Sequence, residues 1–147
     1  MTMVIGIFGE SCTGKSTLAD YLKTKLQAKL FTGKAYLRLA KSENEAREAF
    51  RQLLAGATGE EHILYVMAEK HLLSLLPDHA TRILVTAELE TIKSRFAGRM
   101  GGKLPAPVAA MLERNHGCFD AETHHIHYRA GEMDPESVYN TLITYLS

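Results

Sequence analysis

Residues 9–16 have the types and the spacing of a loop that binds the phosphates of a nucleotide. They read Gly-Glu-Ser-Cys-Thr-Gly-Lys-Ser, which is the pattern G-x-x-x-x-G-K-S. Its glycines allow backbone conformations that other residues avoid, so that consecutive N–H groups can face one anion. In this pattern Lys15 reaches the β- and γ-phosphates, and the hydroxyl of Ser16 binds magnesium. The spacing therefore predicts a site for Mg²⁺ and a nucleoside triphosphate.

The sequence on both sides of this loop has the order that the motif requires, a strand before it and a helix after it. An apolar run ends at Phe8, and a helical pattern begins at Lys15. The helix would add its N-terminal N–H groups and its positive dipole end. The alternative is a glycine-rich turn that binds nothing. We expect the nucleotide to be contacted by Gly9, Ser11, Cys12, Thr13, Gly14, Lys15, Ser16 and Thr17.

A second cationic segment, residues 95–103, combines glycines with basic side chains. Phosphoryl transfer needs positioning and positive charge more than covalent help. We therefore expect a mobile lid whose closure excludes water and whose Arg95, Arg99 and Lys103 follow the transferred group. Arg95 would also contact the nucleotide, and Lys15, Arg95 and Arg99 are the candidate catalytic residues. An ordinary solvated loop is the alternative.

Glu69 directly follows a predicted buried strand at residues 62–68. An acid at the carboxyl end of a central strand, beside a phosphate loop, can hold magnesium directly or through water. Ser16 and Glu69 are therefore the candidate metal ligands. The alternative for Glu69 is a first-turn acid of the helix that follows. Several histidines lie near Cys118, but their spacing matches no standard zinc pattern.

These candidates need a scaffold, and the pattern of apolar residues predicts alternating strands and helices, typical of a parallel sheet covered by helices. Strands are expected at residues 3–8, 34–40, 62–68, 82–87 and 123–128. Helices are expected at residues 15–30, 70–76, 89–97 and 105–115. Two more helices are expected to begin at Ser42, with Glu45 as capping-box partner, and at Asp134-Pro135-Glu136.

Length and composition indicate one globular domain of 147 residues. The 17 basic and 17 acidic residues balance, which argues against a nucleic-acid surface. No apolar run is long enough to span a membrane, and residues 1–4 do not begin a signal peptide. Two cysteines make no disulfide framework, so a reduced, cytoplasmic location is expected. Nothing in the pattern sets an oligomeric state.

Taken together, these motifs resemble a small P-loop kinase of the nucleoside-monophosphate kinase group, most closely its cytidylate kinase-like branch. The likeness covers most of the chain and rests on residues 9–17, 77–99 and 111–115. It implies a three-layer α/β/α P-loop fold with a five-stranded parallel sheet in the order 2-3-1-4-5 and a short arginine-bearing lid. It also implies an ATP–Mg²⁺ donor and a small phosphate acceptor such as CMP.

The chain departs from that family on the side of the acceptor. The family has a glycine and an arginine after the third strand, where this chain has residues 68–71, Ala-Glu-Lys-His. The family has an aspartate and an arginine after the lid, where this chain has residues 115–118, Asn-His-Gly-Cys. The acceptor-binding insert is short, and Arg38, Arg47 and Arg51 are the residues there that could compensate.

Three functions are compatible with this pattern. The first is a kinase that moves the γ-phosphoryl group of ATP to a small-molecule acceptor. The second is a nucleotide-binding sensor or regulatory module without transferase activity, and the third is a slow nucleotide hydrolase. The Asn-Lys-x-Asp pattern that reads guanine is absent from the sequence, which favours ATP over GTP.

Overall fold

The computed structural model describes residues 2–56 and 61–146. Within these residues, five parallel strands form one sheet in the order β2-β3-β1-β4-β5, which confirms the order that the resemblance implied. The strands are β1 (Val4–Phe8), β2 (Lys29–Thr32), β3 (Ile63–Met67), β4 (Thr81–Thr86) and β5 (Ile126–Arg129). Because all five run in the same direction, their carboxyl ends meet at one edge, where α/β sheets bind ligands.

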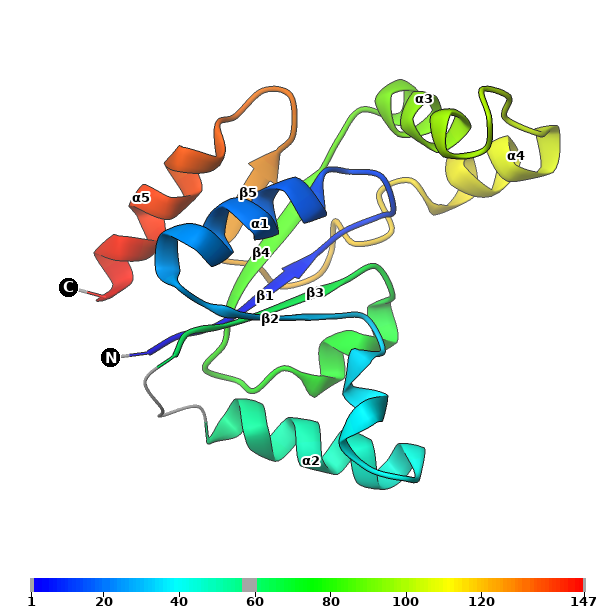
Figure 1. Ribbon diagram of the computed structural model, residues 1–147. Coiled ribbons are helices and arrows are strands. Elements are labelled where there is room, and N and C mark those ends of the chain that lie inside the picture. The colour runs from blue at the N-terminus through cyan, green and yellow to red at the C-terminus, as the bar shows by residue number, and fades with distance from the viewer. Residues whose placement is uncertain (1, 57–60, 147) are drawn as a thin grey trace.

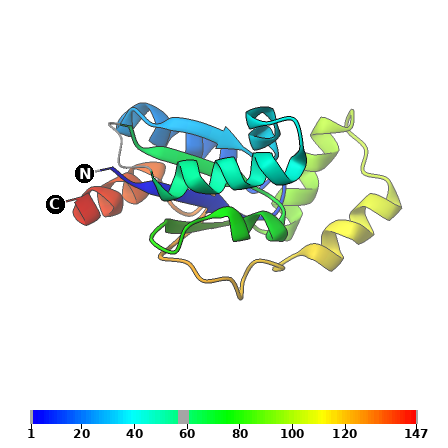
Figure 2. The same cartoon turned by 90° about the horizontal axis from the view of Figure 1, so that it is seen from below.

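Helices cover both faces of the sheet, which makes three layers (Figures 1 and 2). Helices α1 (Lys15–Leu26) and α5 (Pro135–Leu146) lie on one face. Helix α2 (Glu43–Ala55) and two 3₁₀ helices, η1 (Ala35–Leu39) and η2 (Lys70–Leu75), lie on the other. Helices α3 (Leu89–Arg99) and α4 (Ala106–Asn115) pack against each other and project beyond the carboxyl edge (Figure 1).

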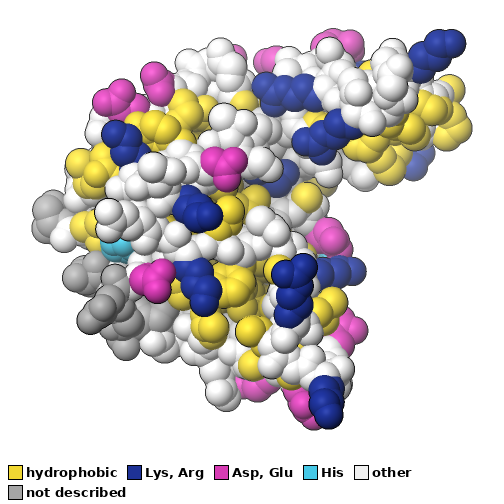
Figure 3. All heavy atoms as spheres, in the orientation of Figure 1, with side chains coloured by type: hydrophobic (Ala, Val, Ile, Leu, Met, Phe, Trp, Pro, Cys, Tyr) yellow, Lys and Arg dark blue, Asp and Glu magenta, His cyan; other side chains and the backbone are white. Residues whose placement is uncertain are grey.

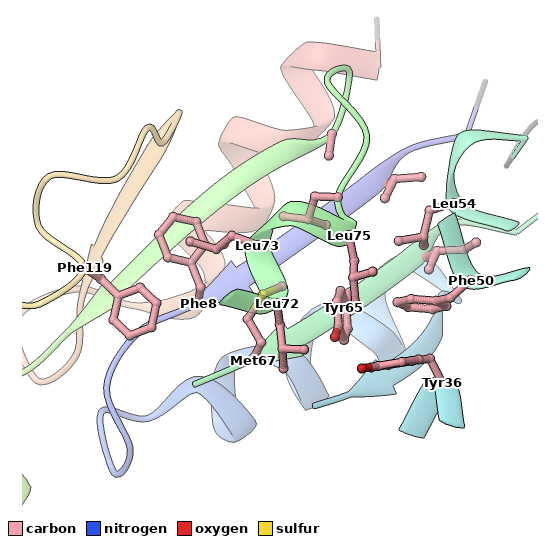
Figure 4. Packing of buried hydrophobic residues seen from close by; sticks show 14 of the residues in the cluster. Phe8, Tyr36, Phe50, Leu54, Tyr65, Met67, Leu72, Leu73, Leu75 and Phe119 are labelled. Carbon is pink, nitrogen blue, oxygen red and sulfur yellow. The ribbon is translucent and has the colours of Figure 1, made fainter. Parts of the chain in front are cut away.

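The alternation of side chains along each strand divides the core between the two faces. Ile5 and Ile7 join the cluster under α1 and α5, whereas Phe8 joins the cluster under α2 and η2. In the second cluster Phe50 of α2 stacks on Tyr36 and meets Tyr65 edge to face (Figure 4). Every residue of β1 and β3 is buried, which confirms the prediction of a buried strand at β3.

Two predicted helix starts are confirmed by their caps. The Ser42 hydroxyl accepts the Glu45 N–H at 3.2 Å before α2. The carboxylate of Asp134 accepts the Glu136 N–H at 3.1 Å, and Pro135 opens α5. A hydroxyl or carboxylate at this position satisfies one of the N–H groups that have no partner within the helix.

The prediction for residues 15–40 was wrong in two places. The first helix ends at Leu26 because Gln27 takes a left-handed conformation (φ 54°), and β2 follows directly at Lys29–Thr32. The segment expected as a strand at residues 34–40 is the 3₁₀ helix η1. Its apolar alternation is misleading, because Tyr36 supplies the buried contact with α2 while Leu37 and Leu39 are exposed.

The segment expected to form a mobile lid, residues 95–103, is only partly a loop. Its first half belongs to helix α3, which continues to Arg99, and the turn that follows contains Gly101 and Gly102 at positive φ. Other bounds shifted less: β5 begins at Ile126 rather than at residue 123, and residues 70–75 form a 3₁₀ helix. None of the helices in the described part of the chain is long and apolar enough to cross a membrane.

Candidate functional site

The predicted phosphate loop connects β1 to α1 at the carboxyl edge of the sheet. Gly9 is required by close packing, because a Cβ atom there would lie 2.2 Å from the main-chain oxygen of Val85 on β4. Gly14 is required by its conformation, with φ at +102°. No side chain caps α1 at Gly14 among the described residues, so the first N–H groups of the helix are suited to an anion.

Lys15 lies inside this loop, only 8% exposed. Its ammonium group donates to the main-chain oxygen of Glu10 at 2.5 Å, and the Thr13 hydroxyl donates to the same oxygen at 2.8 Å. Burial lowers the pKa of Lys15 from 10.5 to about 8, and the Arg99 guanidinium acts in the same direction. A phosphate group beside the ammonium would oppose both effects, because an opposite charge favours the charged form.

A cavity of about 470 Å³ brings the predicted residues together. Its wall combines the phosphate loop with the end of β3, helix α3 and the turn after β5. The lining residues are Ser11, Cys12, Gly14, Lys15, Ser16, Thr17, Ala68, Arg95, Arg99, Tyr128, Ala130 and Gly131. Most of the predicted loop residues, together with Arg95 and Arg99, meet at this cavity. The predicted residues Gly9, Thr13 and Lys103 do not line it. Tyr128 and Gly131 also line it, whereas Arg129 lines a neighbouring cavity.

Helices α3 and α4 contact the phosphate loop directly through Cys12. The Cys12 side chain is 6% exposed and packs with Ile92 of α3 and Leu112 of α4. Its main-chain oxygen accepts a hydrogen bond from Arg95 Nη1 at 3.1 Å. Cys12 itself has φ at 65°, a left-handed conformation that is uncommon outside glycine. The arginine-bearing helix is thus anchored on the loop in this structure.

The two candidate metal ligands are placed differently. Ser16 is exposed at the start of α1 and lines the cavity, so its hydroxyl offers the hard oxygen donor that Mg²⁺ prefers. Glu69 follows β3 but does not line that cavity: its half-exposed carboxylate lies 4.0 Å from Lys34 Nζ and 3.5 Å from His71 Nε2. Magnesium ligation by Glu69 stays a prediction. No group of three or more metal-binding side chains occurs within residues 2–56 and 61–146.

The sequence reasoning missed the role of Glu10, which occupies a variable position of the loop motif. Its side chain is 11% exposed, and both carboxylate oxygens are engaged. Oε2 accepts the Gly117 N–H at 3.0 Å, and Oε1 lies 3.2 Å from His116 Nδ1. No local signal could have paired residues more than a hundred positions apart in the chain.

Glu10 also borders a second cavity, of about 490 Å³, beneath the segment between α4 and β5. There the Thr86 hydroxyl lies 2.8 Å from His127 Nε2. Burial, together with the neighbouring Arg129, lowers the pKa of His127, which favours its neutral form.

The acceptor side has few cations at the places where the resembled family has arginines. Lys70, after β3, pairs with Glu122 at 3.4 Å, and His116 is held by Glu10. Of the compensating residues, Arg47 lies 3.5 Å from Glu43 and beside the Tyr36 hydroxyl, a contact that raises the pKa of Arg47.

No protein-family model matches this chain, and no curated protein sequence matches it. Solved structures do match over nearly the whole length. An uncharacterized protein from Eubacterium ventriosum has a TM-score of 0.66 at 17% identity, with 98% of both chains covered. Shikimate kinase from Bacteroides thetaiotaomicron has 0.63 at 16% identity, again with 98% of both chains covered. A gluconokinase from Sinorhizobium meliloti has 0.61 at 12% identity, with 97% of this chain and 90% of that one covered. The chain shares the α/β fold of these solved structures, two of which are kinases by name.

Proposed function

We propose that the protein is an ATP-dependent phosphotransferase that moves the γ-phosphoryl group of Mg²⁺–ATP to a small molecule. One observation carries the proposal: a single cavity is lined by Lys15 and Ser16 of the phosphate loop and by two arginines, Arg95 and Arg99, of helix α3. A nucleotide-binding loop alone would serve a sensor equally well. Positive side chains added from a separate element suit a reaction in which phosphate oxygens carry the developing charge.

Each residue has a distinct part in this reaction. The N–H groups of the loop and of the start of α1 bind phosphate oxygens, and Lys15 neutralises charge on the β- and γ-phosphates. Arg95 and Arg99 stabilise the transferred group while an acceptor oxygen forms a bond to the γ-phosphorus and the bond to the β–γ bridging oxygen breaks, so that this oxygen leaves as part of ADP. An ionised phosphate acceptor has no proton to lose, whereas a hydroxyl acceptor releases its proton to water. When bound, Mg²⁺ adds charge neutralisation and orientation, and the Ser16 hydroxyl is suited to hold it.

The acceptor belongs on the open side of this cavity. In Figure 3 the surface is hollowed below the lobe formed by α3 and α4, next to the end of the molecule that carries η1 and α2. The resemblance to cytidylate kinases makes CMP one candidate acceptor. The names of the structural neighbours add shikimate and gluconate as candidate acceptors. These two molecules offer hydroxyl groups and are not nucleotides.

The test is the release of ADP from Mg²⁺–ATP with CMP, other nucleoside monophosphates, shikimate and gluconate offered in turn. We expect release that depends on one acceptor class in the wild type and is lost in Lys15→Ala. Lys23→Ala, an exposed lysine on the same helix, is the matched control and keeps full turnover. Equal turnover in Lys15→Ala and wild type would contradict the proposal.

A nucleotide-binding sensor or regulatory module is the second candidate. The observation that favours it is the lack of an arginine in residues 68–71, after β3. This function predicts ATP or ADP binding without ADP release for any acceptor. A slow nucleotide hydrolase would instead release ADP at the same rate with and without acceptors, so the same assay separates all three functions.

A further inference from the structure

Glu10 holds two parts of the molecule at once. Its main-chain oxygen accepts from Lys15 and Thr13 inside the phosphate loop. Its carboxylate accepts from Gly117 and contacts His116, which follow helix α4. An exposed ion pair contributes little, but a carboxylate that is 11% exposed with both oxygens engaged fixes the position of its own backbone.

The partner side of this contact is shaped to receive the carboxylate. Gly117 has φ at +80°, and a Cβ atom there would lie 3.1 Å from an oxygen of Asp120. The turn around it is closed by two main-chain bonds, Cys118 N to Asn115 O and Asp120 N to Gly117 O, each 3.0 Å long. The Gly117 N–H is thereby presented to Glu10 by a conformation that other residues rarely adopt.

Residues 116–125, which we call the connecting segment, are also attached to the body of the protein at points away from Glu10. Phe119 is buried against Phe8 of β1, with ring centroids 5.8 Å apart, as Figure 4 shows. Glu122 pairs with Lys70, and the N–H of His125 donates to Arg82 O at 2.8 Å. Because the connecting segment is fixed by these contacts, it can support the phosphate loop. Its contact with the loop is made through Glu10.

We propose that Glu10 is a positioning residue, which through the connecting segment holds the phosphate loop, and therefore Lys15, in register with helices α3 and α4. The inference rests on the proposed phosphotransferase function. The loop is held from two directions: Cys12 packs between α3 and α4, and Glu10 is tied to the segment that leaves α4. Glu10 acts through Lys15 and touches no reacting atom.

Glu10→Ala and Glu10→Gln separate position from charge. Alanine removes the tie to Gly117 and His116. Glutamine removes the charge but keeps an oxygen that can accept from the Gly117 N–H. Glu122→Gln is the matched control, because it breaks the pair with Lys70 on the same segment, away from the phosphate loop.

We expect Glu10→Ala to lower kcat at least tenfold while KM for ATP changes less than threefold, because displacing Lys15 removes more stabilisation from the transition state than from the ground-state complex with ATP. Glu10→Gln should restore kcat to within about threefold of the wild type, as only the geometry is needed. Glu122→Gln should leave kcat unchanged. If Glu10→Ala and Glu122→Gln have equal kcat values, or if Glu10→Ala only lowers Tm, the role is structural and the inference is overturned.

A second readout needs no turnover. If the Glu10 carboxylate holds the phosphate loop, hydrogen exchange of the amides of residues 10–14 and of Gly117 should be faster in Glu10→Ala, close to wild type in Glu10→Gln and unchanged in Glu122→Gln. If the wild type transfers no phosphoryl group, the proposed function fails. Separately, amide exchange in Glu10→Ala equal to that of the wild type overturns the tie between Glu10 and the phosphate loop.

Discussion

Replacing Lys15 with methionine should abolish phosphoryl transfer and at the same time stabilise the folded protein. Lys15 is 8% exposed, and burial lowers its pKa from 10.5 to about 8. At neutral pH that shift corresponds to a destabilisation of about 3 kcal/mol, since each pKa unit is worth about 1.4 kcal/mol. Methionine has a similar length and no charge to bury.

The expected gain is smaller than this figure, because methionine also loses the hydrogen bond from Lys15 to Glu10 O. A net value of about 1 kcal/mol for that bond leaves a stabilisation of about 2 kcal/mol at pH 7. For a domain of this size it corresponds to a rise in Tm of about 4–8 °C. The measurement is thermal or urea unfolding of wild type, Lys15→Met and the control Lys23→Met, which replaces an exposed lysine of the same helix.

The pH dependence gives the sharper check. Between about pH 8 and pH 10.5 the unfolded chain binds more protons at this position than the folded protein, so wild-type stability rises with pH in that window. Lys15→Met lacks this contribution, and its advantage over the wild type should shrink by about 1 kcal/mol between pH 7 and pH 9. A Lys15→Met variant that unfolds more easily than the wild type at pH 7 would refute the reasoning.

Three further predictions follow from single contacts. Gly9→Ala should lower the free energy of unfolding by about 2 kcal/mol or more, because its Cβ would overlap the Val85 oxygen; a melting temperature equal to that of the wild type would contradict this. Arg95→Ala should lower turnover about a hundredfold while stability falls by only about 1 kcal/mol, the value of its bond to Cys12, as steady-state kinetics and calorimetry on one preparation would measure. Ser42→Ala should cost about 1 kcal/mol of stability with turnover unchanged, and a kinetic defect there would contradict the placement of its role in α2 alone.

The sequence predicted best those parts of the fold whose cause is local. The prediction that residues 9–16 connect a strand to a helix is confirmed, because this local structure follows from glycines and a helix start within eight positions. The caps at Ser42 and Asp134 were found for the same reason. Strand β2 was missed because Gln27 ends α1 in a left-handed conformation without a glycine, and because Lys29–Thr32 is a short edge strand with little burial. The resemblance supplied the strand order, which pattern alone would not have fixed.

The residues of the candidate site also differ in whether local sequence could identify them. Residues within the loop were named from their spacing, and Arg95 and Arg99 from their charge in a glycine-containing segment. Glu10 was not named, because its importance comes from Gly117, a partner that follows α3 and α4 in the sequence. The motif treats that position as variable, since any residue can fill it as long as its main chain is correctly placed.

This distinction bears on how the proposed reaction is controlled. The groups that bind phosphate are encoded together in one loop, whereas the groups that fix the loop in place come from distant segments, through Cys12 and Glu10. Burying Lys15 costs stability, so the loop must be held by contacts outside itself, and the buried Cys12 side chain and the engaged Glu10 carboxylate are those contacts. Replacing these two side chains should therefore change the reactivity of Lys15 while the main-chain N–H groups proposed to bind phosphate remain in the loop.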